Sequence, residues 1–174
     1  METDTPRIDI EIGDNQSHME IDLHRLRHLV RRTLALEEVE AASISVALVD
    51  DPTIRAVNAR HLGHDWPTDV ISFPFSEPGD PELAGELVVS AEMALTTARS
   101  IGADPFAELA LYVVHGLLHL RGHDDRTSEG AASMRIREAE VLADLGLANT
   151  FGLAVGPEVE GAANPGRGAD RWTL

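Results

Sequence analysis

The sequence predicts a single domain that combines α-helices with β-strands. At 174 residues the chain has the length of one domain, and 43% hydrophobic with 25% charged residues is ordinary for a folded soluble protein. Short segments with strand patterns and longer segments with helical periodicity follow one another along the chain. These observations predict one hydrophobic core, within a domain over residues 1–155.

Four elements are predicted in the first third of the chain. Residues 7–12 alternate apolar and polar side chains, which is typical of a strand, and residues 43–49 (SISVALV) predict a second strand. Residues 21–37 carry leucines and a valine at helical spacing with arginines on other faces, which indicates an amphipathic helix. Residues 51–61 predict a helix that an Asp-Pro pair opens, because proline is tolerated at the first helical position.

Five further elements are predicted beyond residue 67. Residues 68–75 and 86–90 are strand candidates, separated by the turn-rich stretch EPGDPELAG. Helices are predicted over 91–100 and over 104–122, the latter capped by an aspartate before a proline. A last helix is predicted from the capping residue Thr127. Its apolar face consists of Met134, Val141, Leu142 and Leu145.

Composition narrows the possible functions. The chain has no cysteine, so a disulfide framework and thiolate metal ligands are excluded. The acidic N-terminus lacks the pattern of a secretory signal and no apolar run approaches the roughly 18 residues that span a bilayer, which predicts a cytoplasmic protein without a membrane partner. The net charge of −16 argues against a broad basic surface for nucleic acid.

The C-terminal segment differs in composition from the rest of the chain. From residue 156 onward it is rich in Gly, Pro and Ala and has little periodicity. A segment of this kind cannot form a second core, so residues 156–174 are predicted to be a mobile tail.

The strongest functional signal lies at the end of the helix predicted over 104–122. His115 and His119 are four residues apart, so they lie one helical turn from each other and two imidazole nitrogens can bind one ion. Gly122 ends the helix, because glycine adopts the left-handed conformation that a reversal needs, and Asp125 follows as a third ligand. The pattern H-x3-H-x2-G-x2-D predicts a divalent metal site.

The surroundings of the two histidines favour a ligand role over a packing role. Core histidines can bond to backbone acceptors, but several ionisable groups beside a core cost free energy unless something pairs them. His24 and His28 share the four-residue spacing but lie among arginines on a polar helix face, which predicts that they are solvated. We expect the two ligand histidines to stand together on the helix surface, away from one apolar stripe. That stripe consists of Phe106, Leu109, Ala110, Val113, Leu117 and Leu120.

The available ligand types indicate a catalytic zinc site. Three protein ligands leave the fourth position of a tetrahedral Zn²⁺ open to water, and such a water becomes a nucleophile near neutral pH. The motif therefore predicts a metal-dependent hydrolase with one Zn²⁺ per chain. Asp125 is favoured as the third ligand, with His123 and Asp124 as alternatives; Asp124 is also suited to hydrogen-bond a ligand imidazole.

Three sequence motifs resemble those of one family. Residues 115–125 (HGLLHLRGHDD) resemble the signature HGxLHLxGYDH of the YbeY family of bacterial ribosomal RNA maturation factors. Residues 67–75 (PTDVISFPF) resemble its PT(D/N)VLSF strand, and residues 84–90 (AGELVVS) resemble its G(D/E)IxIS strand. The motifs keep the family's order and cover most of residues 45–145.

The resemblance implies a fold, an activity and partners. The implied fold is α+β, a zincin-like single domain with a mixed sheet of about four strands surrounded by about five helices. The implied activity is a metal-dependent endoribonuclease that cuts single-stranded RNA in 16S ribosomal RNA 3′-end maturation and in 70S ribosome quality control. The implied partners are the small ribosomal subunit with its RNA, a small-subunit ribosomal protein and the Era GTPase.

The resemblance also implies roles for particular residues. It places His115 and His119 in catalysis as well as in metal binding. An arginine such as Arg60 or Arg121 would bind RNA and stabilise the charge that develops on the phosphate.

This sequence departs from the family pattern at three positions. Asp125 stands where the family usually has its third histidine, although a carboxylate is an acceptable zinc ligand. His123 stands where the family usually has tyrosine. Leu62 stands where the family has an arginine, three residues before Asp65, so Arg60 is the candidate replacement.

Two other functions compete with RNA cleavage. A zincin metallopeptidase shares the ligand spacing, but Gly116 stands where those enzymes carry the glutamate that serves as general base. A non-enzymatic ribosome assembly factor would use the metal as a structural staple. A protein ligand in the fourth coordination position would favour the staple, whereas an open position favours an enzyme.

Overall fold

The computed structural model describes residues 5–151. The predicted tail at 156–174 and both ends of the domain predicted over 1–155 lie outside the described residues. The elements run in the order β1 (Arg7–Asp14), α1 (Leu23–Leu36), β2 (Ala41–Val49), α2 (Asp51–Leu62), β3 (Val70–Pro74), β4 (Leu83–Ser90), α3 (Ala91–Ile101), α4 (Pro105–Arg121) and α5 (Ser128–Asp144).

The four strands form one mixed sheet in the order β1-β2-β4-β3. β1 and β2 are parallel, with Ile10 beside Ile44, and β2 and β4 are parallel. β3 is antiparallel to β4 and forms an edge of the sheet. The fold class is therefore confirmed as α+β, with a mixed four-stranded sheet and five helices in the part of the chain that the structure describes.

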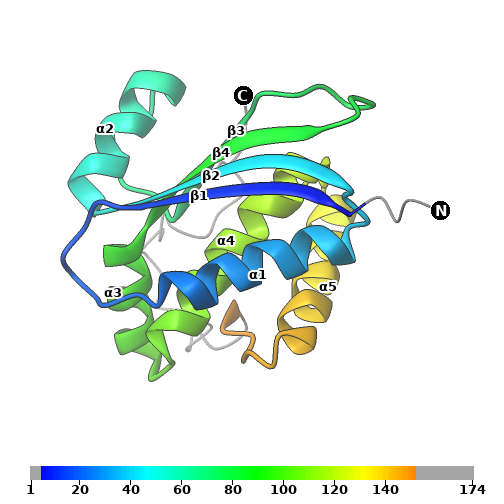
Figure 1. Cartoon of the computed structure of the whole chain (residues 1–174). Helices are drawn as coiled ribbons and strands as arrows, with labels where there is room; N and C mark the ends of the chain where they lie inside the picture. Colours follow the sequence, from blue (N-terminus) through cyan, green and yellow to red (C-terminus); the bar gives the residue numbers. More distant parts are fainter. Residues whose placement is uncertain (1–4, 152–174) are drawn as a thin grey trace.

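The helices divide unequally between the two faces of the sheet. α1, α3, α4 and α5 lie on one face, and α2 alone lies on the other (Figure 1). The main core lies under the four helices and includes Ile44, Val46 and Leu87 from the sheet. A small second cluster lies under α2, made of Val49, Ile54, Ile71 and Val88. Alternation of side chains along each strand thus supplies two apolar surfaces.

The predicted helix starts agree with the structure because capping side chains are present. The Asp104 side chain accepts a hydrogen bond from Phe106 N at the start of α4, and Thr127 Oγ1 accepts one from Gly130 N at the start of α5. The helix predicted over 21–37 placed Asp22 inside its first turn. In the structure Asp22 is instead the residue that caps α1. Each cap satisfies an N–H that has no partner within the helix.

α4 occupies the centre of the helical layer and is buried around its whole circumference. Thirteen of its 17 residues are buried, because it contacts β3 and β4 as well as α1, α3 and α5. The expectation of a single apolar stripe was therefore wrong. The histidines also do not stand on the surface, since His115 and His119 expose only 15% and 12% of their side chains.

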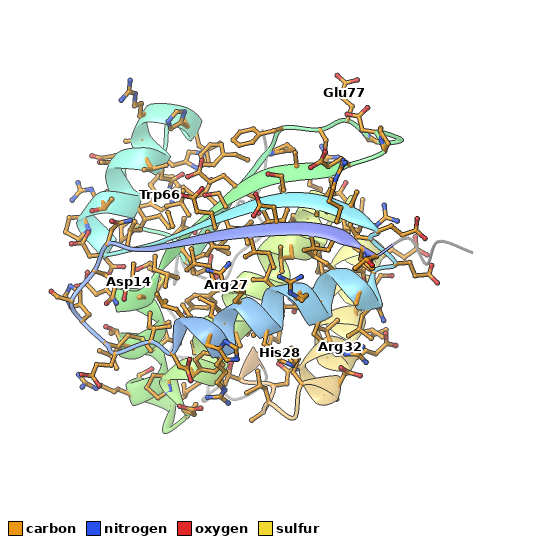
Figure 2. All side chains as sticks on the ribbon, viewed as in Figure 1. Asp14, Arg27, His28, Arg32, Trp66 and Glu77 are labelled. Atoms are coloured by element: carbon orange, nitrogen blue, oxygen red, sulfur yellow. The ribbon has the colours of Figure 1, made fainter. Side chains whose placement is uncertain are left out.

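The second histidine pair with four-residue spacing is solvated, as predicted. His24 and His28 are both exposed on α1, in agreement with their position on its polar side; Figure 2 labels His28 on the outer surface of this helix. None of the helices in residues 5–151 is long and apolar enough to cross a membrane.

Candidate metal centre

The structure brings the three predicted ligands together. His115 Nε2 and His119 Nε2 are 3.1 Å apart, and Asp125 Oδ2 lies 3.7 Å from the first and 3.5 Å from the second. All three side chains are half-buried, and their donor atoms lie close enough together to hold one metal ion. Helical spacing brings the two imidazoles together, and the loop after α4 adds the carboxylate.

The spacing of these donors fits a tetrahedral ion. Two ligands bound to zinc at about 2.0–2.1 Å in tetrahedral geometry lie about 3.3–3.4 Å from each other. The three donor separations, 3.1, 3.5 and 3.7 Å, bracket that value. Two imidazoles and one carboxylate are also a ligand set that zinc accepts. His115, His119 and Asp125 therefore fit the implied metal.

A tight reversal after α4 positions Asp125. Gly122 has φ 105°, a left-handed conformation that glycine adopts without strain. The N–H groups of Gly122 and His123 then bond to the carbonyls of His119 and Leu118, at 3.0 Å each. These bonds satisfy the last carbonyls of the helix and direct the chain back toward the two imidazoles.

Asp124 and His123, the alternatives for the third ligand, have other partners. Asp124 is exposed and forms an ion pair with Arg126 at 2.7 Å; hydrogen bonds from the Arg126 side chain and backbone lower the pKa of Asp124 to about 2. His123 Nε2 lies 2.8 Å from Glu37 Oε2. Asp124 is hydrogen-bonded to Arg126 rather than, as considered from the sequence, to a ligand imidazole. The geometry therefore favours Asp125.

The charge state of Asp125 suits metal binding. Burial alone would raise the pKa of this carboxyl, but the hydrogen bond from His119 and the charges of both histidines outweigh it. The pKa of Asp125 is held below its ordinary value as a result. The carboxylate is thus ionised near neutral pH and able to coordinate a cation.

Glu138 is a site residue that sequence reasoning missed. Its side chain is almost fully buried, and its Oε1 hydrogen-bonds to His115 Nδ1. This bond leaves Nε2 of His115 directed at the candidate ion and is the usual way in which a carboxylate orients a ligand imidazole. A signal was present in the sequence, because Glu138 is a lone acid four residues after Met134 on the apolar face of α5.

We predict that Glu138→Gln weakens metal affinity about 10- to 100-fold, the usual effect of losing such a partner. The amide keeps the size of the side chain but removes the charge that holds His115. Metal affinity would be measured by competition with a chromogenic chelator, with circular dichroism to verify folding. Glu129→Gln is the matched control, since it removes the same charge from an exposed position of α5. Equal affinities for both variants would contradict the role of Glu138.

A second network missed from the sequence ties α1 to α5 beside the metal loop. Glu37 accepts a hydrogen bond from Arg137 at 2.5 Å and contacts His123, and Arg137 also bonds to Glu140 at 2.8 Å. Burial would raise the pKa of Glu37, but the bonds to His123 and Arg137 and their charges hold it below its ordinary value. This network anchors the loop that carries Asp125.

The two candidate arginines lie in different places. A cleft of about 530 Å³ opens beside His119 and is lined by Arg121, by residues 38–41 and by the loop between β3 and β4. Arg121 is exposed and donates to Glu37 O at 3.3 Å. Arg60 is exposed in the last turn of α2, on the opposite face of the sheet from α4 (Figure 1). The structure thus places Arg121, rather than Arg60, at the cleft.

Gly116 is packed tightly against the sheet. A Cβ at this position would lie 2.9 Å from Leu87 Cδ2 and 3.0 Å from Val70 Cγ2, and Gly116 O accepts a hydrogen bond from Ser72 Oγ at 3.1 Å. Real Cβ contacts of this length are very rare, so a larger side chain would have to displace the buried side chains of Leu87 and Val70. The packing at position 116 therefore disfavours the glutamate base that a zincin peptidase carries there.

Comparisons with known proteins agree with the motifs. Residues 11–146 match the family model described as "Endoribonuclease YbeY". This chain belongs to the YbeY family. A relative from Carboxydothermus hydrogenoformans named "Endoribonuclease YbeY" is 38% identical over 79% of this chain and 97% of its own.

Two further matches extend the comparison. A YbeY relative from Rhodopirellula baltica is 46% identical over 65% of this chain and 59% of its own. The solution structure of the Thermotoga maritima protein TM1509 matches with a TM-score of 0.54 and 25% identity, covering 78% of this chain and 90% of that one. The YbeY match at 11–146 includes His115, His119, Asp125 and Glu138, so the whole candidate centre lies inside the family domain.

Proposed function

We propose that this chain is a zinc-dependent endoribonuclease specific for single-stranded RNA, acting in 16S ribosomal RNA 3′-end maturation and 70S ribosome quality control. Membership of a family named for endoribonuclease activity supports the reaction class. The observation that carries the metal dependence is the spacing of His115, His119 and Asp125, which matches a tetrahedral ion.

The chain's own residues divide the work at the site. His115, His119 and Asp125 would hold the ion, and Glu138 would keep His115 in the binding orientation. Zinc, when bound, supplies a Lewis acid for the phosphodiester and lowers the pKa of water. Arg121 at the cleft would attract a substrate phosphate. The role of Arg60 in catalysis and RNA binding stays a prediction. Arg60 is exposed on α2 and does not line the cleft, so it could contact RNA only outside the cleft.

The setting follows from the family resemblance. The proposed partners are the small ribosomal subunit and its RNA, a small-subunit ribosomal protein and the Era GTPase, and the proposed location is the cytoplasm. The number of ligands favours an enzyme over a structural staple, because the grouping found in residues 5–151 offers three donors and leaves a tetrahedral ion one further position.

Metal removal tests the proposal. Purified full-length protein is expected to cleave a single-stranded RNA that carries the 3′ end of precursor 16S RNA, to lose this activity on chelation, and to recover it with added Zn²⁺. Duplex RNA of the same sequence should remain intact, and casein serves as the peptidase substrate. Cleavage that persists after verified metal removal would refute metal dependence, and casein cleavage without RNA cleavage would favour the peptidase.

A further inference from the structure

Two exposed aromatic rings flank the edge strand β3. Large hydrophobic side chains are exposed at three places in residues 5–151: Trp66 is 42% exposed, Phe75 is 67% exposed and Ile136 is 62% exposed. Trp66 precedes β3 by four residues and Phe75 directly follows it. Two of the three most exposed apolar side chains thus occur at the two ends of one five-residue strand, whereas Ile136 lies on α5.

Other rings and a buried amide support Trp66 and Phe73, a residue of β3. His64 stacks on Trp66 with ring centroids 4.6 Å apart and an interplanar angle of 13°. Asn58, which is buried on α2, donates to Trp66 O at 2.9 Å and fixes the loop. Figure 2 places Trp66 beside α2. On β3, Phe73 packs edge-on against His61 at 5.3 Å. Trp66 and Phe73 are therefore held in place before any ligand binds.

The aromatic residues lie on the α2 face of the sheet, across the edge strand β3 from the cleft that His119 lines. Alternate residues of a strand share a face, and Phe75 N continues the ladder by bonding to Ala84 O at 2.9 Å, so Phe73 and Phe75 face the same way. Pro74 and Ser76, on either side of Phe75, point to the other face of the strand and line the same cleft as His119, so the rings and the cleft meet at the edge strand. We name the set Trp66, His64, His61, Phe73 and Phe75 the aromatic surface.

The charge near this surface differs from that of the whole chain. Residues 53–66, which follow Asp50 and Asp51 at the start of α2, contain two arginines and two histidines against one aspartate, in a chain with a net charge of −16. Arg55 pairs with that aspartate, Asp65, through bonds of 2.9 and 3.2 Å. Arg60 remains as a positive charge near the rings. The loop after Phe75 instead carries Glu77, so dense phosphate contacts are disfavoured there.

We propose that the aromatic surface binds the unpaired bases of single-stranded RNA by stacking, with Trp66 and Phe75 as the principal contacts. This inference rests on the proposed function and assigns it a substrate-binding surface. Stacking on aromatic rings accepts every base, because every base has a π-face, so an acidic chain gains a contact to RNA that does not depend on its net charge. Paired bases are already stacked inside a duplex, so the same surface selects single strands.

Trp66 provides its own reporter for the test. The chain contains two tryptophans, Trp66 and Trp172, so full-length Trp172→Phe leaves Trp66 as the sole indole. A short single-stranded RNA, added in the presence of chelator to keep it intact, is expected to quench this fluorescence saturably. Duplex RNA of the same sequence should not.

The affinity of substituted variants for RNA tests the inference quantitatively. Trp66→Ala and Phe75→Ala are each expected to weaken the Kd for labelled single-stranded RNA about tenfold, with little change in the salt dependence. Ile136→Ala is the matched control, because it removes another exposed large apolar side chain, from α5, and should bind as wild type. Circular dichroism verifies that each variant is folded.

Several outcomes would overturn the inference. Wild-type affinity in both aromatic variants would assign the rings to another partner, such as a protein. Equal binding of duplex RNA would also refute base stacking. These results are separable from failure of the proposed function, because binding is measured without metal. Trp66-dependent binding without zinc-stimulated cleavage would refute the proposed endoribonuclease activity but support the aromatic surface as an RNA-binding site. Wild-type cleavage and an unchanged Kd in both variants would support the activity and refute the binding role of the aromatic surface.

Discussion

Replacing His119 with alanine is expected to empty the metal site and abolish RNA cleavage. The substitution removes one of three donors, and residues that only orient a ligand already contribute about 10- to 100-fold to metal affinity. We therefore expect affinity to fall by at least about 100-fold. His119 is half-buried at the end of α4, and the thirteen buried residues that hold this helix in the core are unchanged, so the fold should persist. Metal analysis of the purified variant and cleavage of single-stranded RNA provide the measurements.

His28→Ala is the control for this experiment. His28 belongs to the pair His24 and His28, which has the same four-residue spacing but is exposed on α1. Its removal should leave metal content and cleavage at wild-type values. Unaltered metal content in the His119 variant would refute the ligand assignment, whatever happens to activity.

Gly130→Ala is expected to damage the metal centre without touching a ligand. A Cβ at position 130 would lie 2.2 Å from Asp124 O, a backbone atom that cannot move aside without moving the loop that carries Asp125. Overpacking of this kind costs about 1–3 kcal/mol of folding free energy. Metal affinity should fall together with stability, because the carboxylate is displaced from the two imidazoles. Chelator competition and denaturant unfolding measure the two effects.

Ser133→Ala tests whether the effect is specific to the loop contact. Ser133 is exposed in the same helix, one turn later, and its substitution should change neither affinity nor stability. If Gly130→Ala binds metal as tightly as wild type while being destabilised, the loop adjusts independently of the ligands. That result would show that Asp125 does not depend on this packing.

Local sequence signals predicted most of the fold. Asp104 and Thr127 mark helix starts because a capping side chain acts within three residues. His115 and His119 could be paired from spacing alone, since the α-helix fixes their relation. These features depend on neighbours in the chain, so they require no knowledge of how distant elements pack.

Features that depend on tertiary packing could not be predicted in this way. The bond between Glu138 and His115 joins residues 23 positions apart, and it exists only because α5 packs against α4. The Glu37–Arg137 pair spans 100 positions. The burial of α4 on all sides was likewise missed, because an apolar stripe read from periodicity identifies one covered face and not the helices that cover the others.

The three metal donors are carried by elements that differ greatly in how well they are packed. His115 and His119 belong to the helix with the most buried residues, whereas Asp125 belongs to a short loop in which its neighbours Asp124 and Arg126 are exposed. Loop opening costs much less free energy than release of a central helix. A bound ion would therefore dissociate when the loop opens and the carboxylate of Asp125 moves away, while His115 and His119 keep their positions. Reloading then requires only that the loop close again, so metal turnover would proceed without unfolding of the domain.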